Sequence, residues 1–133
     1  MTSVLIIGGG GMIGQKLALS FTENETVSLL DMNFPANSDV NAHKILGSVS
    51  DASIMEKALS NRPDTIFYLA SVVSGEAEAN FSKGWDVNIQ AFWSFLAQIK
   101  DQYSKSDGEY KPKVIFTSSI AVFGSPFPNK ISA

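Results

Sequence analysis

Apolar and polar positions alternate in blocks along this chain, and the blocks predict strands that take turns with helices. Short apolar runs with the composition of strands buried on both faces occupy residues 4–7, 26–30, 44–46, 65–70 and 114–117. Apolar residues that recur at steps of three and four predict helices over residues 12–21, 52–60 and 84–103. The alternation favours an α/β fold of the Rossmann type, with a doubly wound parallel sheet of about five strands.

The longest predicted helix carries one continuous apolar stripe. Its members are Trp85, Ile89, Phe92, Leu96, Ile99 and Tyr103. A row of aromatic residues can stack on nucleic-acid bases, but such surfaces are basic, and the net charge of this chain is −3. We therefore expect the stripe to pack against the sheet.

The first apolar run leads into four consecutive glycines, and another glycine follows in the next predicted helix. A strand, a glycine turn and a helix N-terminus form a phosphate site, because glycine lets the backbone come close and the helix presents free N–H groups. Gly9, Gly11 and Gly14 fit G-x-G-x-x-G, and Gly8 with Gly11 and Gly14 fits G-x-x-G-x-x-G. A flexible turn is the alternative. A P-loop is disfavoured, because Gln15 and not lysine follows the last glycine.

Asp31 strengthens the nucleotide interpretation and indicates which dinucleotide binds. It ends the second apolar run, about 20 residues beyond the glycine loop, where dinucleotide folds place an acid on the adenosine ribose. Its carboxylate would repel the 2′-phosphate of NADP, and no arginine lies nearby to receive that phosphate. We therefore predict NAD as the cofactor.

Composition narrows the class of protein. At 133 residues, 44% of them hydrophobic, the chain predicts one globular domain spanning residues 1–133. The negative net charge disfavours nucleic acid and anionic membranes as partners, and no apolar run is long enough to span a bilayer. The lack of cysteine and the single histidine, His43, predict no metal site and no histidine triad. A chain without disulfides suits the cytoplasm.

In a parallel sheet, ligands bind beyond the carboxyl ends of the strands. The residues predicted at those ends are Gly8–Gly14, Asp31, Gly47–Ser50, Ala70–Ser74 and Thr117–Gly124. Hydroxyl groups such as those of Ser118 and Ser119 can hydrogen-bond a substrate oxygen where hydride is exchanged. Alternatively, they satisfy backbone groups of a turn.

Several of these motifs together resemble the extended short-chain dehydrogenase/reductases, the NAD-dependent epimerase/dehydratase family. The motifs are the triplet Gly8, Gly11 and Gly14, then Asp31, Leu69-Ala70, Asp86-Val87-Asn88 and residues 118–124. Within that family, residues 73–79 and 116–124 look most like the branch of D-erythronate dehydrogenases and nucleoside-diphosphate-sugar epimerases.

The resemblance implies roles for individual residues. The implied cofactor site is Gly8, Gly11, Met12, Ile13, Gly14, Asp31, Val49, Leu69, Ala70, Ser71, Ser74, Asn88 and Ser118. Ser119 matches the catalytic serine that hydrogen-bonds the reacting oxygen. Glu76 and Glu78 are expected to contact substrate or solvent, because the base of the family is a tyrosine. Ser48 stands where many relatives have aspartate, which weakens one contact to adenine.

The tyrosine base of the family belongs to a Tyr-x-x-x-Lys motif, and this sequence contains none before it ends at Ala133. We therefore expect this chain to be the NAD-binding, N-terminal part of a longer oxidoreductase. We expect the substrate-binding region of that enzyme to be absent from this chain. The resemblance implies hydride transfer between NAD and a hydroxyl of a sugar acid such as D-erythronate, by a homodimer. The alternatives are a nucleotide-sugar epimerase or dehydratase and an NAD-binding module without chemistry.

Overall fold

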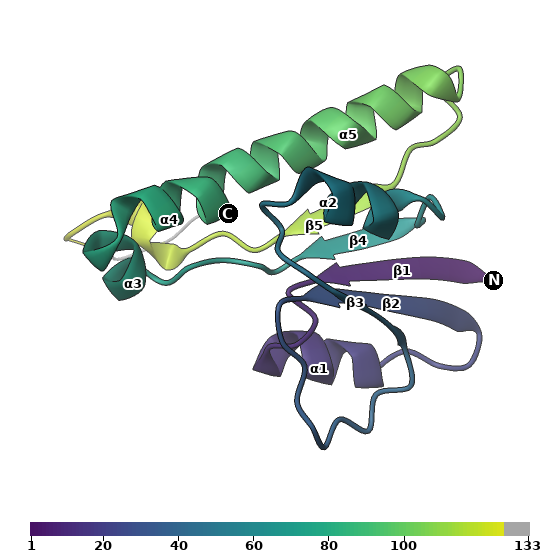
Figure 1. Cartoon of the computed structure of the whole chain (residues 1–133), viewed down its shortest axis with the longest axis horizontal. Helices are drawn as coiled ribbons and strands as arrows, with labels where there is room; N and C mark the ends of the chain where they lie inside the picture. Colours follow the sequence, from purple (N-terminus) through teal and green to yellow (C-terminus); the bar gives the residue numbers. More distant parts are fainter. Residues whose placement is uncertain (127–133) are drawn as a thin grey trace.

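The computed structural model describes residues 1–126, which form a five-stranded parallel sheet with helices on both faces (Figure 1). The strands are β1 (Thr2–Ile7), β2 (Glu25–Asp31), β3 (His43–Leu46), β4 (Thr65–Tyr68) and β5 (Lys113–Phe116). They lie in the order β3-β2-β1-β4-β5, and every neighbouring pair is parallel. This arrangement confirms the predicted Rossmann-type sheet, whose strand order reverses beside β1.

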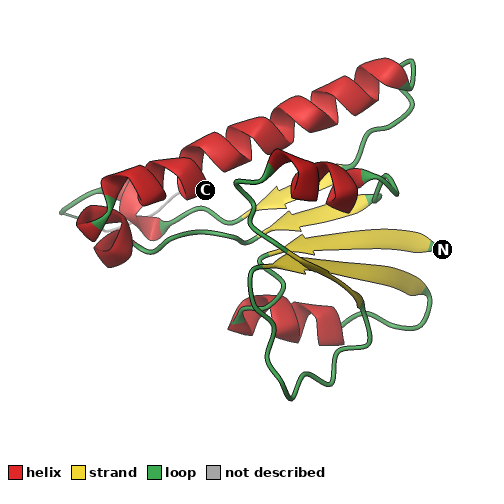
Figure 2. Ribbon diagram, viewed as in Figure 1, coloured by secondary structure: helices red, strands yellow, loops and turns green. Residues whose placement is uncertain are grey.

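The helices form two layers and a cap. They are α1 (Met12–Leu19), α2 (Ala52–Leu59), α3 (Ser74–Ala79), α4 (Phe81–Trp85), the π-helical turn η1 (Asp86–Gln90), α5 (Ala91–Lys105) and the 3₁₀ turn η2 (Ile120–Phe123). One face of the sheet is covered by α1, and the other by α2 and α5 (Figures 1 and 2). Both α3 and α4 lie beyond the carboxyl end of β4 (Figure 1). No helix in residues 1–126 is long and apolar enough to cross a membrane.

The side chains of β1 alternate between two cores. Leu5 and Ile7 are fully buried on the side of α2 and α5, where Phe95 joins them. Val4 and Ile6 are buried on the side of α1. A central parallel strand has no solvent face, which explains why the first apolar run is uninterrupted.

Asp51 begins α2 by capping its first turn. Its Oδ1 accepts hydrogen bonds from the N–H groups of Ser53 at 2.9 Å and Ile54 at 3.4 Å. The hydroxyl of Ser53 and these amides hold the pKa of the Asp51 carboxyl below its usual value. Asp51 is thus the N-cap of α2, a position that favours Asp, Asn, Ser and Thr.

The prediction that the whole apolar stripe of the long helix is core is wrong. Trp85 and Ile89 are each 50% exposed and Leu96 is 42% exposed, whereas Ala91 and Phe95 are buried. The helix is turned so that the small Ala91 allows close approach to the sheet and Phe95 fills the core. The sequence pattern also assumes a regular α-helix, in which apolar residues three or four apart share a face. The wide π turn η1 changes the register between α4 and α5.

Two further boundaries differ from the sequence pattern. The pattern does not predict α3, because none of its six residues is buried and it therefore has no apolar face. The predicted strand over 65–70 ends at Tyr68, and the N–H of Leu69 then donates to the carbonyl of Ile7 at 2.8 Å before the chain leaves the sheet. Residues 127–133 lie outside the described residues.

Candidate functional site

Two neighbouring hollows lie at the carboxyl ends of the strands. Their volumes are about 280 Å³ and about 340 Å³. They share four lining residues, Gly8, Gly11, Leu69 and Ser71. Each volume is at or below the small end of the range for small-molecule sites. A ligand as long as a dinucleotide would therefore occupy both hollows and cross the glycine loop between them.

The glycine loop turns sharply where β1 ends. Gly8 has φ of +89°, and a Cβ there would lie 2.8 Å from the backbone nitrogen of Ala70. A Cβ on Gly14 would lie 2.5 Å from the carbonyl oxygen of Gly8. At Gly11 the nearest atom to a Cβ would be 3.6 Å away, an ordinary contact. The fold itself thus requires Gly8 and Gly14, while Gly11 leaves an open surface shared by both hollows.

The N-terminus of α1 opens onto this surface without a side-chain cap. The amide of Gln15 is the first to bond back along the helix, to the carbonyl of Gly11 at 2.9 Å. The amides of Met12, Ile13 and Gly14 therefore have no partner within the helix. All three residues line the second hollow, and the first turn holds no acidic residue. The positive end of the helix dipole is thus uncompensated there and favours an anion.

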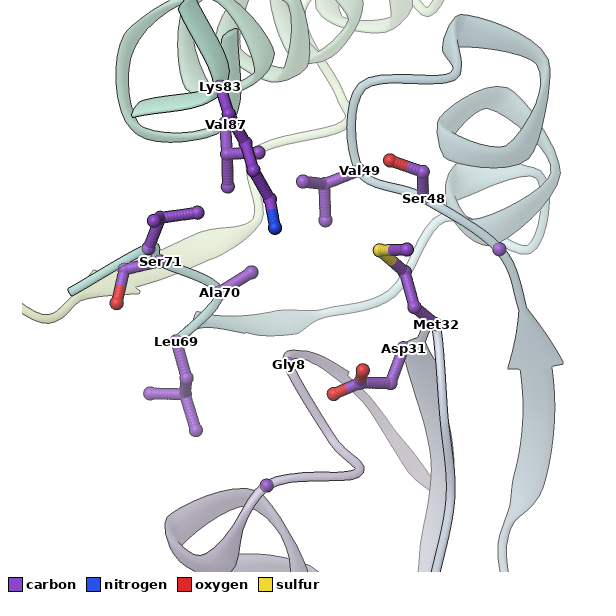
Figure 3. A pocket seen from close by; sticks show the side chains of 13 residues that line it. Gly8, Asp31, Met32, Ser48, Val49, Leu69, Ala70, Ser71, Lys83 and Val87 are labelled. Atoms are coloured by element: carbon purple, nitrogen blue, oxygen red, sulfur yellow. The ribbon is translucent and has the colours of Figure 1, made fainter. Parts of the chain in front are cut away.

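Asp31 lines the first hollow at the end of β2 (Figure 3). Its Oδ2 accepts a hydrogen bond from the N–H of Gly10 at 2.9 Å, and its Oδ1 accepts one from the N–H of Asn33 at 3.3 Å. An ionised carboxylate offers about four acceptor positions, so it can still accept hydrogen bonds from the hydroxyls of a ligand.

Apolar side chains form much of the first hollow, together with polar groups of Ser48, Ser71 and Lys83. Met32 and Val49 point into it from the segments that follow β2 and β3, and Val87 reaches it from η1 (Figure 3). Ser48 also lines it, and its Oγ accepts a hydrogen bond from the N–H of Ser50 at 3.2 Å. Apolar walls with a hydroxyl at their border suit the faces and edge of a nucleobase.

Asn88 fixes the segment that follows β4. Its Oδ1 accepts a hydrogen bond from the N–H of Val72 at 2.8 Å, and its Nδ2 donates to the carbonyl of Val72 at 2.9 Å. One side-chain amide thus satisfies both backbone groups of a residue that lines the first hollow. Asn88 belongs to η1 and lines neither hollow, so it acts on the site through Val72.

Most residues of the expected cofactor site come together in the two hollows. Those that line them are Gly8, Gly11, Met12, Ile13, Gly14, Asp31, Val49, Leu69, Ala70 and Ser71. Ile13 is 62% exposed there.

The structure brings three predicted serines to neither hollow. Ser74 is the exposed first residue of α3, and Ser118 and Ser119 are exposed beyond β5. The Oγ of Ser119 accepts a hydrogen bond from the N–H of Ala121 at 3.1 Å and so caps η2. That contact is the turn-satisfying role that the sequence leaves open for these serines.

Three lining residues, Met32, Lys83 and Val87, were missed by sequence reasoning. Met32 could have been found as the neighbour of Asp31 at a strand end. Val87 stands in the motif Asp86-Val87-Asn88, which implied a role for Asn88 alone. Lys83 carries no signal, because it reaches the hollow only when α4 folds over the end of β4. Gln15 was also missed: its Nε2 donates to the carbonyl of Gly9 at 2.6 Å and steadies the loop.

Comparison with known proteins identifies the family. The sequence profile of the NAD dependent epimerase/dehydratase family matches residues 4–132. The chain belongs to this family. It is 32% identical to D-erythronate dehydrogenase from Cupriavidus necator, over 95% of this chain and 41% of that enzyme. It is 29% identical to D-erythronate dehydrogenase from Haemophilus influenzae, over 96% of this chain and 41% of that enzyme.

Solved structures of other proteins share the fold. The nucleoside-diphosphate-sugar epimerase from Agrobacterium tumefaciens is 37% identical, with a TM-score of 0.80 over 96% of this chain and 40% of that one. UDP-glucose 4-epimerase from Bifidobacterium longum, solved with NAD⁺ and UDP, is 24% identical, with a TM-score of 0.78. The match covers 98% of this chain and 41% of that epimerase. The chain spans about 40% of the length of these relatives.

Proposed function

We propose that this chain binds NAD across the two hollows as the cofactor-binding part of an oxidoreductase. The observation that carries the proposal is the uncapped N-terminus of α1, which opens onto the wall that both hollows share. Gly11 and the free amides of α1 would hold the diphosphate, and Asp31 would accept hydrogen bonds from the ribose hydroxyls. Met32 and Val49 would enclose the adenine.

The residues fit this cofactor on steric and electrostatic grounds. The volume of each hollow alone is small, but together they form a path across the glycine loop. The one acid lining this path, among the described residues, is Asp31, which lies at the adenosine end and away from the helix N-terminus. A 2′-phosphate at that end would meet the carboxylate, so NAD fits better than NADP.

When bound, NAD supplies a hydride acceptor for the oxidation of an alcohol. Ser119 would hold the reacting oxygen once its hydroxyl turns from the N–H of Ala121 towards substrate. Burial raises the pKa of Tyr68 and of Tyr110 to about 12, so neither phenol gives up its proton near neutral pH. The tyrosine base that we infer for the reaction is therefore neither of these two.

For the substrate we propose a sugar acid such as D-erythronate. The support is the 32% and 29% identity to two D-erythronate dehydrogenases. A nucleotide sugar is the second candidate, supported by the 37% identity to the Agrobacterium epimerase. With the whole protein, NADH formation on D-erythronate would support the first. Epimerisation of a nucleotide sugar without accumulation of NADH would support the second.

We also propose that the protein pairs with a second copy through the long helix. The consecutive elements α4, η1 and α5 expose large apolar side chains, namely Phe81, Trp85, Ile89, Trp93 and Leu96. Contiguous apolar patches of this kind mark interaction surfaces in proteins that are otherwise polar outside. Two copies of one helix face can meet across a two-fold axis, because the same residues then serve both partners.

A titration of the Gly11→Ala variant tests the cofactor proposal. A Cβ at position 11 meets no protein atom closer than 3.6 Å, so it intrudes on the shared wall of the hollows and not on the fold. Calorimetry should show saturable NAD binding to the wild type and at least about tenfold weaker binding to the variant. Equal affinities would show that NAD does not cross the glycine loop.

A further inference from the structure

Lys83 extends from α4 into the first hollow. Figure 3 shows its side chain entering beside Val87, with the ammonium nitrogen pointing down towards Ala70 and Gly8. Of the described residues that line the two hollows, Lys83 is the one with a positive charge. A cation thus faces the glycine loop from the wall opposite to β1.

The present partner of this ammonium is a surface carboxylate. Lys83 forms an ion pair with Glu76 of α3, and both side chains are 50% exposed. An ion pair this exposed to water contributes little to stability. The ammonium can therefore leave Glu76 at small cost when a stronger anion enters the hollow.

The glycine loop marks where such an anion would lie. Gly8 and Gly11 line both hollows, and the free amides of α1 meet the second hollow beside them. An anion over Gly11 would have the helix N-terminus on one side and the lysine on the other. Hydrogen bonds between ammonium and phosphate are charge-assisted and stronger than neutral ones.

We propose that Lys83 binds the diphosphate of the adenine dinucleotide and exchanges Glu76 for phosphate oxygens when the nucleotide enters. The proposal rests on the proposed function and adds a residue that clamps the diphosphate from α4. Lys83 would contact phosphate groups alone. Removing its charge should therefore weaken the binding of ligands that carry phosphate and leave the binding of other ligands unchanged.

The test is to titrate the wild type and the Lys83→Met variant with ADP and with adenosine. The variant should bind ADP about tenfold more weakly and adenosine equally well, because it loses a charge but keeps the length of the side chain. Lys83→Arg should retain most of the ADP affinity. Lys105→Met is the matched control, because Lys105 also pairs with a carboxylate, Asp101 at 2.6 Å, and does not line the hollows.

The outcomes separate this proposal from the one on which it rests. Unchanged ADP affinity in Lys83→Met, or an equal loss for adenosine, would overturn the role of Lys83 and leave the NAD site intact. Failure of the wild type to bind either NAD or ADP would overturn the NAD site itself.

Glu76 offers a second readout of the exchange. Glu76→Gln should raise the affinity for ADP, because it frees the ammonium, and should have no effect in the Lys83→Met background. A loss of ADP affinity in Glu76→Gln would contradict the exchange, because it would mean that Glu76 helps to hold the nucleotide. The difference between wild type and Lys83→Met should also shrink as ionic strength rises.

Discussion

Two buried tyrosines illustrate how one hydroxyl can stabilise the fold while another does not. The hydroxyl of Tyr110 donates to the carbonyl of Pro63 at 3.0 Å. The hydroxyl of Tyr68 is buried and finds no hydrogen-bond partner among the described residues, while the ring of Tyr68 packs against those of Phe92, Phe95 and Phe116. Burying an unpaired hydroxyl costs free energy, whereas burying a paired one does not.

We predict opposite effects of removing these two hydroxyls. Tyr110→Phe should lower the free energy of unfolding by about 1 kcal/mol, and Tyr68→Phe should leave it unchanged or raise it. Chemical denaturation of the two variants at neutral pH measures the difference. If Tyr68→Phe cost as much as Tyr110→Phe, the Tyr68 hydroxyl would have a partner after all.

The same phenols predict a fall in stability at high pH. Burial raises the pKa of both to about 12 in the folded chain, whereas an unfolded tyrosine titrates near pH 10. Between these values the unfolded chain loses protons that the folded chain keeps, so the free energy of unfolding falls as pH rises from about 10 to about 12. Tyr68→Phe should make this fall shallower in alkaline unfolding curves, and an unchanged slope would contradict the burial of that phenol.

Single residues were predictable from the sequence when their neighbours along the chain define their role. Asp31 and Gly11 follow from spacing to a strand end and were expected at the site. Lys83 was not expected, because its role depends on the fold of α4 over a distant strand. The hydroxyl of Ser119, bonded to its own turn, shows that a motif does not by itself fix where a side chain points.

The glycine loop combines glycines required for the fold with one that faces open space. Gly14→Ala should lower the free energy of unfolding by about 2 kcal/mol or more, because its Cβ would lie 2.5 Å from the carbonyl oxygen of Gly8. Gly11→Ala should lower the free energy of unfolding by less than about 1 kcal/mol. This loss comes from helix capping, because Gly11 is the N-cap of α1, where alanine is less favourable than glycine. Denaturant unfolding of both variants measures this contrast. Equal losses would mean that Gly11 is also required for packing.

Asn88 of the π turn η1 holds the segment after β4 through its side-chain amide. Asn88→Ala would leave the N–H and carbonyl of Val72 without their partner, so the segment lining the first hollow should loosen. We expect faster hydrogen exchange at the Val72 amide and about tenfold weaker NAD binding. Gln98→Ala, which removes a 3.3 Å hydrogen bond from α5 to Ala52, is the control. Unchanged exchange at Val72 would rule out this positioning role.

Elements with a buried face were predictable, and elements without one were not. The strands and α2 were predicted from their apolar positions. No residue of α3 is buried, so its sequence has no apolar pattern from which to predict it. The sequence pattern also did not predict which face of the long helix packs on the sheet. An apolar stripe identifies a hydrophobic face but does not show which other element covers it.

The exposed apolar face of the long helix should decide the oligomeric state. Trp93, which is 65% exposed, lies on that face, and Trp93→Glu should convert a dimer to a monomer. Leu19→Glu changes an exposed apolar residue of α1, on the other face of the sheet, and should leave the dimer intact. Light scattering measures the mass of each variant. A wild type that is monomeric at all concentrations would refute the pairing.

The whole fold was predictable because strand and helix patterns alternate and leave few topologies for a parallel sheet. Family membership followed from several motifs taken together. The residues of α4 and η1 that enter the hollow could not be predicted, since their position depends on how separate elements pack.

The most direct test of the account is a calorimetric titration of the protein with NAD and with NADP. The uncapped helix and Asp31 predict one NAD site per chain and clearly weaker binding of NADP, whose 2′-phosphate would lie against the carboxylate. No saturable NAD binding, or tighter binding of NADP than of NAD, would contradict the account.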